Sequence, residues 1–150
     1  MTDRPGEAKG LHTIEMTVPS RLGVEKVIMA VASRAAFSMG FDEARVEGIK
    51  TAVSEACINA VEHGNQGDET LSLKVSMTLD PDAMEILAAD EGRGGRPENT
   101  APDIDRKMRG EETPRGLGLF LIKQFVDEVD FVQGADEGNA IRMVFRLKPS

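Results

Sequence analysis

Residues 70–79, TLSLKVSMTL, alternate strictly between polar and apolar side chains, and this pattern constrains the fold more than any other in the chain. Strict alternation is typical of a strand with one face on the core and one face in water. The turn DPD follows, and residues 83–90 form a second predicted strand that ends at Asp90. A sheet that buries one face needs another layer against it, so we expect helices to cover this hairpin.

Two helices are predicted between the first strand of the chain and this hairpin. Residues 11–19 alternate as a strand that closes at a proline. Ser20 is a suitable N-cap for a helix that stops at Gly40. Asp42 can cap a second helix, which runs to about His63 and ends at the following glycine.

The remaining segments complete an α+β pattern. Residues 91–116 are rich in glycine, proline and charge, residues 117–129 form an apolar helix, and a hairpin around residues 134–138 closes the chain. This order suits a two-layer sandwich, with a mixed, mostly antiparallel sheet and its helices on one face. We expect a single domain over residues 11–148, behind a polar tail of residues 1–10.

Composition and charge exclude several classes of function. The net charge is -8, and the chain has no basic run and no Tyr or Trp for stacking on bases, so direct nucleic-acid binding is not expected. No apolar run approaches the roughly 18 residues of a membrane span. The single Cys57 and the absence of a secretory signal indicate a cytoplasmic protein without an internal disulfide.

The first motif lies on the second predicted helix, where Glu55, Asn59 and His63 are spaced four residues apart. A helical wheel separates an apolar arc from a polar one: Val46, Ile49, Val53, Ala56 and Ala60 against Glu55, Asn59 and Glu62. An ordinary solvated helix face would look the same. His63 also suits a helix C-terminus because its charged form interacts favourably with the helix dipole.

The second motif is D-x-G-x-G, formed by Asp90, Gly92 and Gly94 at the end of the hairpin. It can be a plain turn after a strand. Alternatively, a carboxylate at a strand end can accept a hydrogen bond from an exocyclic amine, while the glycines let the backbone lie against a flat ring.

The third motif, RGLGL, places Arg115, Gly116 and Gly118 at the start of the next helix. Free N–H groups and the helix dipole favour phosphate at such a position, and an arginine adds a charge partner. The pattern is neither a Rossmann fingerprint nor a P-loop. Glycines at a loop-to-helix junction are the simpler explanation of this motif taken alone.

In their order and spacing, the three motifs together resemble the GHKL ATPase superfamily, which includes histidine kinases and gyrase. The resemblance covers residues 11–148. The segments GLGLFLIKQFVDEV and IRMVFRL are most similar to the anti-sigma-factor serine kinases of that superfamily. The resemblance implies the Bergerat-type ATP-binding fold.

The resemblance also implies roles for individual residues. Glu55 would be the general base for an attacking serine hydroxyl, Asn59 would ligate Mg²⁺, and Asp90 would bind the adenine amino group. Residues 96–114 would form a lid over the nucleotide. The implied nucleotide-binding residues are Asn59, His63, Asp90, Gly92, Gly94, Arg115, Gly116, Leu117, Gly118 and Leu119.

The implied function is that of a homodimeric anti-sigma factor. With ATP and Mg²⁺, such a protein phosphorylates a serine of an anti-anti-sigma factor, and it holds a sigma factor, while ADP is the product. An exposed edge at residues 11–18 would support the homodimer. No direct contact with nucleic acid or membrane is implied.

Two other functions stay open, and one departure from the family pattern bears on affinity. The chain can be a nucleotide-binding regulatory module without kinase activity, or the catalytic fragment of a histidine kinase. Against the fragment, neither His12 nor His63 lies on a helical hairpin before the domain. Many relatives carry Gly-Thr shortly before the last strand, where this chain has Asn139 and Ala140, so we expect weaker nucleotide binding than usual.

Overall fold

The computed structural model describes residues 12–92, 114–133 and 138–147, and its elements follow the predicted order. In chain order they are β1 (His12–Pro19), α1 (Glu25–Met39), α2 (Glu43–Asn59), the π-helical turn η2 (Ala60–Gly64), β2 (Ser72–Leu79), β3 (Ala83–Ala89), α4 (Pro114–Phe125), β4 (Glu128–Gln133) and β5 (Asn139–Arg146). The predicted tail and most of the predicted lid lie outside the described residues.

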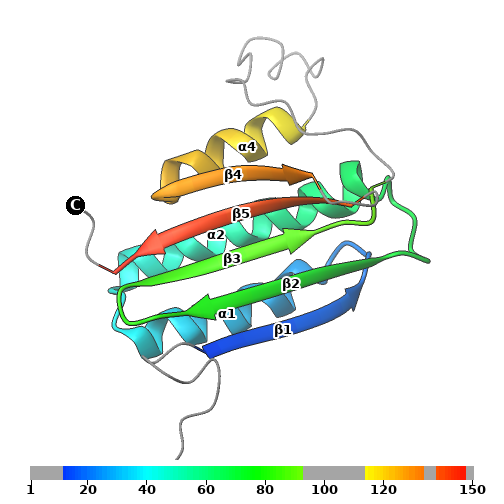
Figure 1. Cartoon of the computed structure of the whole chain (residues 1–150). Coiled ribbons are helices and arrows are strands. Elements are labelled where there is room, and N and C mark those ends of the chain that lie inside the picture. Colours follow the sequence, from blue (N-terminus) through cyan, green and yellow to red (C-terminus); the bar gives the residue numbers. More distant parts are fainter. Residues whose placement is uncertain (1–11, 93–113, 134–137, 148–150) are drawn as a thin grey trace, which may run out of the picture.

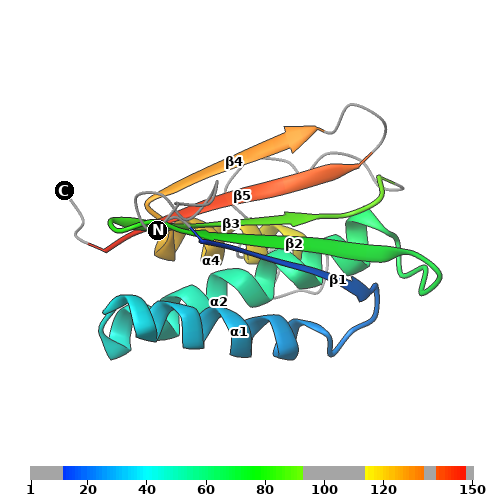
Figure 2. The same cartoon turned by 60° about the horizontal axis from the view of Figure 1, so that its bottom comes forward.

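The strands form one five-stranded sheet in the order β1-β2-β3-β5-β4, and all four described pairings are antiparallel. The helices lie together on one face of this sheet, as Figures 1 and 2 show from two directions. The predicted two-layer α+β fold is confirmed. Because β5 lies between β3 and β4, its first residue, Asn139, comes next to Asp90 at the end of β3.

The core lies between the sheet and the helices. On β2, the alternate residues Leu73, Val75 and Met77 are buried, as the alternation predicts. From α2, the apolar arc enters the same cluster with Ile49 and Val53. None of the helices in the described ranges is long and apolar enough to cross a membrane.

The N-cap prediction at Ser20 is wrong. Helix α1 begins at Glu25, after a turn, and its N-cap position is Val24, which makes no side-chain capping bond. Ser20 is instead fully buried, and its hydroxyl accepts a hydrogen bond from Asn65 Nδ2 at 3.0 Å. The Ser20 hydroxyl therefore binds Asn65, which is distant in the sequence, and does not cap the helix.

The last helix ends earlier than the apolar pattern indicates. Helix α4 stops at Phe125, and Glu128 already belongs to β4. Asp127 explains the break, because its backbone N–H donates to Val144 O at 2.8 Å and its carboxylate accepts from Arg146 N at 2.7 Å. Pairing with β5 thus replaces the final helical turn.

We predict that the Cys57 thiol is unreactive in the folded protein. It is fully buried on α2, and burial, followed by the negative charge of Glu25, raises the pKa of its thiol from 9.0 to about 12. The unfolded chain loses this proton at lower pH than the folded chain, so the thiol's contribution to stability is complete below pH 9 and falls between pH 9 and about 12.

Urea unfolding at several pH values checks this expectation, with Cys57→Ala as the variant that lacks the titrating group. A thiol reagent at pH 8 should modify the unfolded protein quickly and the native protein slowly. Equally fast modification of the native protein would contradict the burial of this side chain.

Candidate functional site

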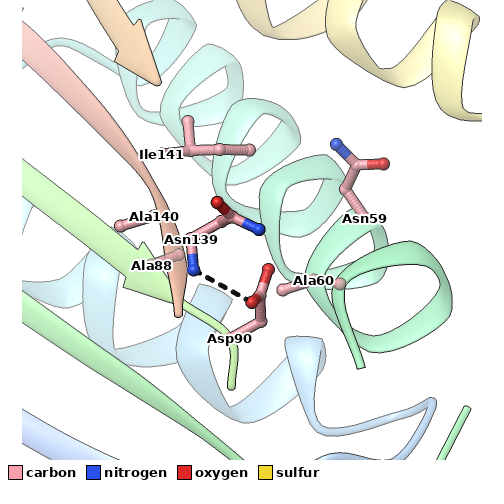
Figure 3. A pocket seen from close by; sticks show the side chains of 8 residues that line it. Asn59, Ala60, Ala88, Asp90, Asn139, Ala140 and Ile141 are labelled. Atoms are coloured by element: carbon pink, nitrogen blue, oxygen red, sulfur yellow. Dashed lines mark hydrogen bonds between the residues drawn. The ribbon is translucent and has the colours of Figure 1, made fainter. Parts of the chain in front are cut away.

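A small pocket opens between the end of α2 and the ends of two central strands. The helical side contributes Asn59, Ala60 and Gly64, and the sheet contributes the residues around Asp90 and Asn139. Figure 3 shows the Asp90 carboxylate directed across the space between these two walls. The full lining is Asn59, Ala60, Gly64, Ala88, Asp90, Asn139, Ala140 and Ile141.

The carboxylate of Asp90 is oriented by backbone groups. Its Oδ1 accepts hydrogen bonds from Gly92 N at 2.6 Å and from Asn139 N at 3.1 Å, the latter drawn in Figure 3. Gly92 makes its bond from a left-handed conformation, with φ 84°, which favours glycine. In the D-x-G part of the second motif, Gly92 therefore helps to fix one carboxylate oxygen of Asp90.

Gly64 lets the helix end approach this carboxylate. A Cβ on Gly64 would lie 2.7 Å from Asp90 Cβ and would overlap the carboxylate itself. Sequence reasoning treated this glycine only as a helix stop and missed its contact with Asp90. The signal available in the sequence was the position of this glycine directly after His63 of the first motif. In the structure, His63 lies half-buried in η2.

Asn59 does not lie on a solvated helix face. The side chain of Glu62 is exposed, as a solvated face requires, but Asn59 is only 6% exposed. Its Oδ1 is buried and has no hydrogen-bond partner among the described residues. Leaving such an oxygen unpaired costs about 1–3 kcal/mol, so the site suits a ligand that the oxygen can coordinate.

A Mg²⁺ ion fits this oxygen, because Mg²⁺ prefers oxygen ligands and is commonly held by one or two protein groups together with substrate phosphates. Within the described part of the chain, no cluster of three or more His, Cys, Asp or Glu side chains could hold a metal by itself. Ligation by Asn59 would therefore depend on a phosphate-bearing partner.

Helix α4 packs against α2 at two glycines. A Cβ on Gly48 would lie 2.7 Å from Phe125 Cδ1, and one on Gly118 would lie 2.9 Å from Glu55 Oε2. The structure thus brings Gly118, predicted to bind phosphate, beside Glu55, the predicted base. The two residues belong to different helices, which the packing of α4 on α2 brings together.

The other predicted residues of the third motif are partly described. Arg115, Gly116 and Leu117 lie in the first turns of α4. The Leu119 side chain is 2% exposed within the core, so only its backbone can face a nucleotide. Gly94 and residues 96–113 of the predicted lid lie outside the described residues.

Asn139 is a pocket residue that sequence reasoning noted only as a departure. Its backbone exchanges hydrogen bonds with Asp90, which donates its own N–H to Asn139 O at 2.8 Å. Figure 3 shows the Asn139 side-chain amide beside the Asp90 carboxylate. An amide therefore occupies the pocket wall here.

The chain was compared with known protein families. Residues 18–145 match the histidine kinase-like ATPase domain. The chain belongs to this family. The family match confirms the superfamily resemblance seen in the three motifs.

Curated relatives share the same region. Serine-protein kinase RsbW of Bacillus subtilis (strain 168) is 34% identical over 127 residues, which cover 77% of this chain and 75% of the relative. The protein of the same name from Halalkalibacterium halodurans is 35% identical over 136 residues, which cover 88% and 82%.

Solved structures agree on the fold. The RsbU and RsbW domains of a Mycobacterium tuberculosis protein superpose with a TM-score of 0.64 at 20% identity, covering 90% of this chain and 32% of that one. The SiaB–SiaC complex of Pseudomonas aeruginosa gives 0.63 at 12% identity, covering 88% of each chain. At these identities the likeness shows the two-layer fold alone.

We predict that Asp90→Asn weakens ADP binding at least about tenfold, since an unpaired donor in a closed pocket costs about 1–3 kcal/mol. The two backbone N–H groups on Oδ1 would hold the oxygen of the new amide. Its NH₂ group would then face the pocket and oppose the adenine amine donor to donor.

Calorimetric titration with ADP and GDP measures the effect. The natural protein should bind GDP much more weakly, because guanine presents a carbonyl where adenine has its amine. Asp82→Asn, at an exposed turn, is the control. Equal binding of the two nucleotides would remove Asp90 from base recognition.

Proposed function

We propose that this protein is an ATP-dependent protein serine kinase that also acts as an anti-sigma factor. One observation carries the proposal: the same pocket is lined by a carboxylate fixed by backbone N–H groups and by a buried amide oxygen that has no hydrogen-bond partner among the described residues. The first suits the amine of adenine, and the second suits the cation that accompanies phosphates. Mg-ATP carries the amine on its base at one end and the cation on its phosphates at the other.

The adenine end of the pocket is built by Asp90 and its neighbours. The small apolar side chains of Ala60, Ala88 and Ala140 line the pocket beside the carboxylate. A flat base can lie between them while its amine donates to Asp90. Apolar walls with a few fixed polar groups are the usual construction of such sites.

The phosphate end lies toward Asn59 and α4. Asn59 Oδ1 would ligate Mg²⁺, which when bound neutralises charge on the phosphates. The first turn of α4 carries Arg115, Gly116 and Leu117, and backbone N–H groups at a helix start favour phosphate. The packing of α4 on α2 fixes this helix start relative to Glu55.

Glu55 would serve as the general base. Its carboxylate lies against Gly118, at the face that α2 presents to α4. In this role it would accept the proton of an incoming serine hydroxyl while that oxygen attacks the γ-phosphorus and ADP leaves with the bridging oxygen and the electron pair of the broken P–O bond. The relatives' name, serine-protein kinase, supports a protein serine as the acceptor.

The family and one edge of the sheet support a proposal for the partners. We infer that the kinase substrate is a small anti-anti-sigma protein and that a sigma factor is the retained partner. Strand β1 pairs with β2 along one side and forms an end of the sheet order. A second copy of the chain can pair with that outer edge, which would give a homodimer.

We predict that Glu55→Gln keeps most of the ADP affinity but lowers phosphoryl transfer by about 10²–10⁴-fold, because it removes only the proton acceptor. Asn59→Ala should instead lose Mg²⁺-dependent nucleotide binding. Glu62→Gln, which changes an exposed carboxylate in η2, is the matched control and should behave as the natural protein. Normal turnover in Glu55→Gln would show that the base is another group.

We also predict that purified protein retains a sigma factor and, with Mg-ATP, phosphorylates a serine of its antagonist. The phosphate adds about two negative charges facing a protein of net charge -8, so the complex with the antagonist should weaken. Gel filtration follows the complexes and mass spectrometry follows the phosphate. If nucleotide binds but no partner is retained or modified, a non-kinase regulatory module is the better assignment.

A further inference from the structure

Asn65 is a fully buried polar residue that belongs to none of the three motifs. It directly follows η2, and its side chain is 0% exposed. Buried polar side chains in folded proteins have hydrogen-bond partners, and those partners show what the residue holds together.

The three side-chain bonds of Asn65 join three separate segments. Its Nδ2 donates to Ser20 Oγ at 3.0 Å and to Ser72 O at 3.1 Å. Its Oδ1 accepts from Glu91 N at 2.8 Å. An asparagine has two donors and one acceptor oxygen on its amide, so all three groups are used.

The bond to Glu91 N acts on the peptide group that carries Asp90. The N–H of the Asp90–Glu91 peptide is held by Asn65 Oδ1, and its carbonyl oxygen is packed against Gly138, where a Cβ would lie 2.6 Å away. A peptide group is planar, so contacts on both of its sides fix its orientation. The Cα atom of Asp90 lies in this plane, and the side chain that ends in the carboxylate is attached to that atom.

Glu91 adds a second connection to the same place. Its Oε2 accepts from Ser72 N at 2.5 Å, beside the Ser72 carbonyl that Asn65 already binds. The residue before Asn65 is Gly64. Because it has no side chain, its backbone can lie close to the Asp90 carboxylate. Gly64 and Asn65 therefore define the position of Asp90 from two directions.

We propose that Asn65 is a positioning residue for base recognition: it holds the Asp90–Glu91 peptide so that the Asp90 carboxylate meets the exocyclic amine of adenine. This rests on the proposed assignment of Asp90 to the base. The bonds to Ser20 and Ser72 hold the amide itself, and the bond to Glu91 N transmits that position to the pocket. Hydrogen bonds weaken steeply with misalignment, so a small shift of this peptide reduces discrimination.

The test compares ADP with purine riboside 5′-diphosphate, which lacks the exocyclic amine, by calorimetric titration. The natural protein should prefer ADP by about tenfold or more, the effect of leaving the carboxylate without its donor. In Asn65→Ala this preference should fall to about twofold or less, while binding of the analogue changes little.

Two further variants separate positioning from general stability. Ser20→Ala removes one bond on the far side of the amide, so it should lower thermal stability yet keep the ADP preference within about twofold. Asn65→Asp keeps an acceptor for Glu91 N–H and loses both donors, so it should retain the preference in spite of reduced stability. This variant decides the matter if Asn65→Ala does not fold.

The outcomes distinguish this inference from the proposed function. An Asn65→Ala protein that keeps the full ADP preference overturns the inference, as does a loss of preference in Ser20→Ala or Asn65→Asp equal to that in Asn65→Ala. If the natural protein binds both nucleotides equally, or neither, the assignment of Asp90 to adenine fails instead.

Discussion

The close approach of the α2 layer to the end of β3 is the constraint on which the site depends. Gly64 meets Asp90 where any side chain would overlap the carboxylate. The helix reaches this point by ending in a π turn, closed by a bond from Asn65 N to Ala60 O at 2.8 Å. The wider turn changes the direction in which the last residues face, and such turns are frequent at functional sites.

Helix α2 is buried on two sides, which separates it from an ordinary amphipathic helix. One side, with Val53 and Cys57, lies in the apolar core. Another side carries Asn59 into the pocket and Glu55 against α4. Within the described part of the chain, the Asn59 amide oxygen has no hydrogen-bond partner, which costs stability unless a ligand uses the oxygen.

The negative charge of Asp90 bears on the orientation of the proposed nucleotide. A carboxylate opposes the anionic phosphates and can accept a hydrogen bond from a base amine, so in the proposed function Asp90 meets the base. At the other end, a helix start and a neutral amide oxygen suit phosphates and their cation. The hydrogen bonds from two backbone N–H groups to Asp90 Oδ1 hold the carboxylate in one orientation.

By itself, the sequence determined the order of the elements, the buried face of β2, the capping of α2 by Asp42 and the three motifs. These follow from local chemistry: side-chain alternation, a capping carboxylate and glycine at tight turns. The tertiary structure alone decided where α4 ends, because Asp127 pairs with β5, and where Ser20 points, because Asn65 binds it. It also decided that Asn59 is buried while Glu62 is exposed, and that Gly64, Asn65 and Asn139 surround Asp90. Contacts between residues distant in the chain arise from sheet order and helix packing, and one sequence carries no local pattern for them.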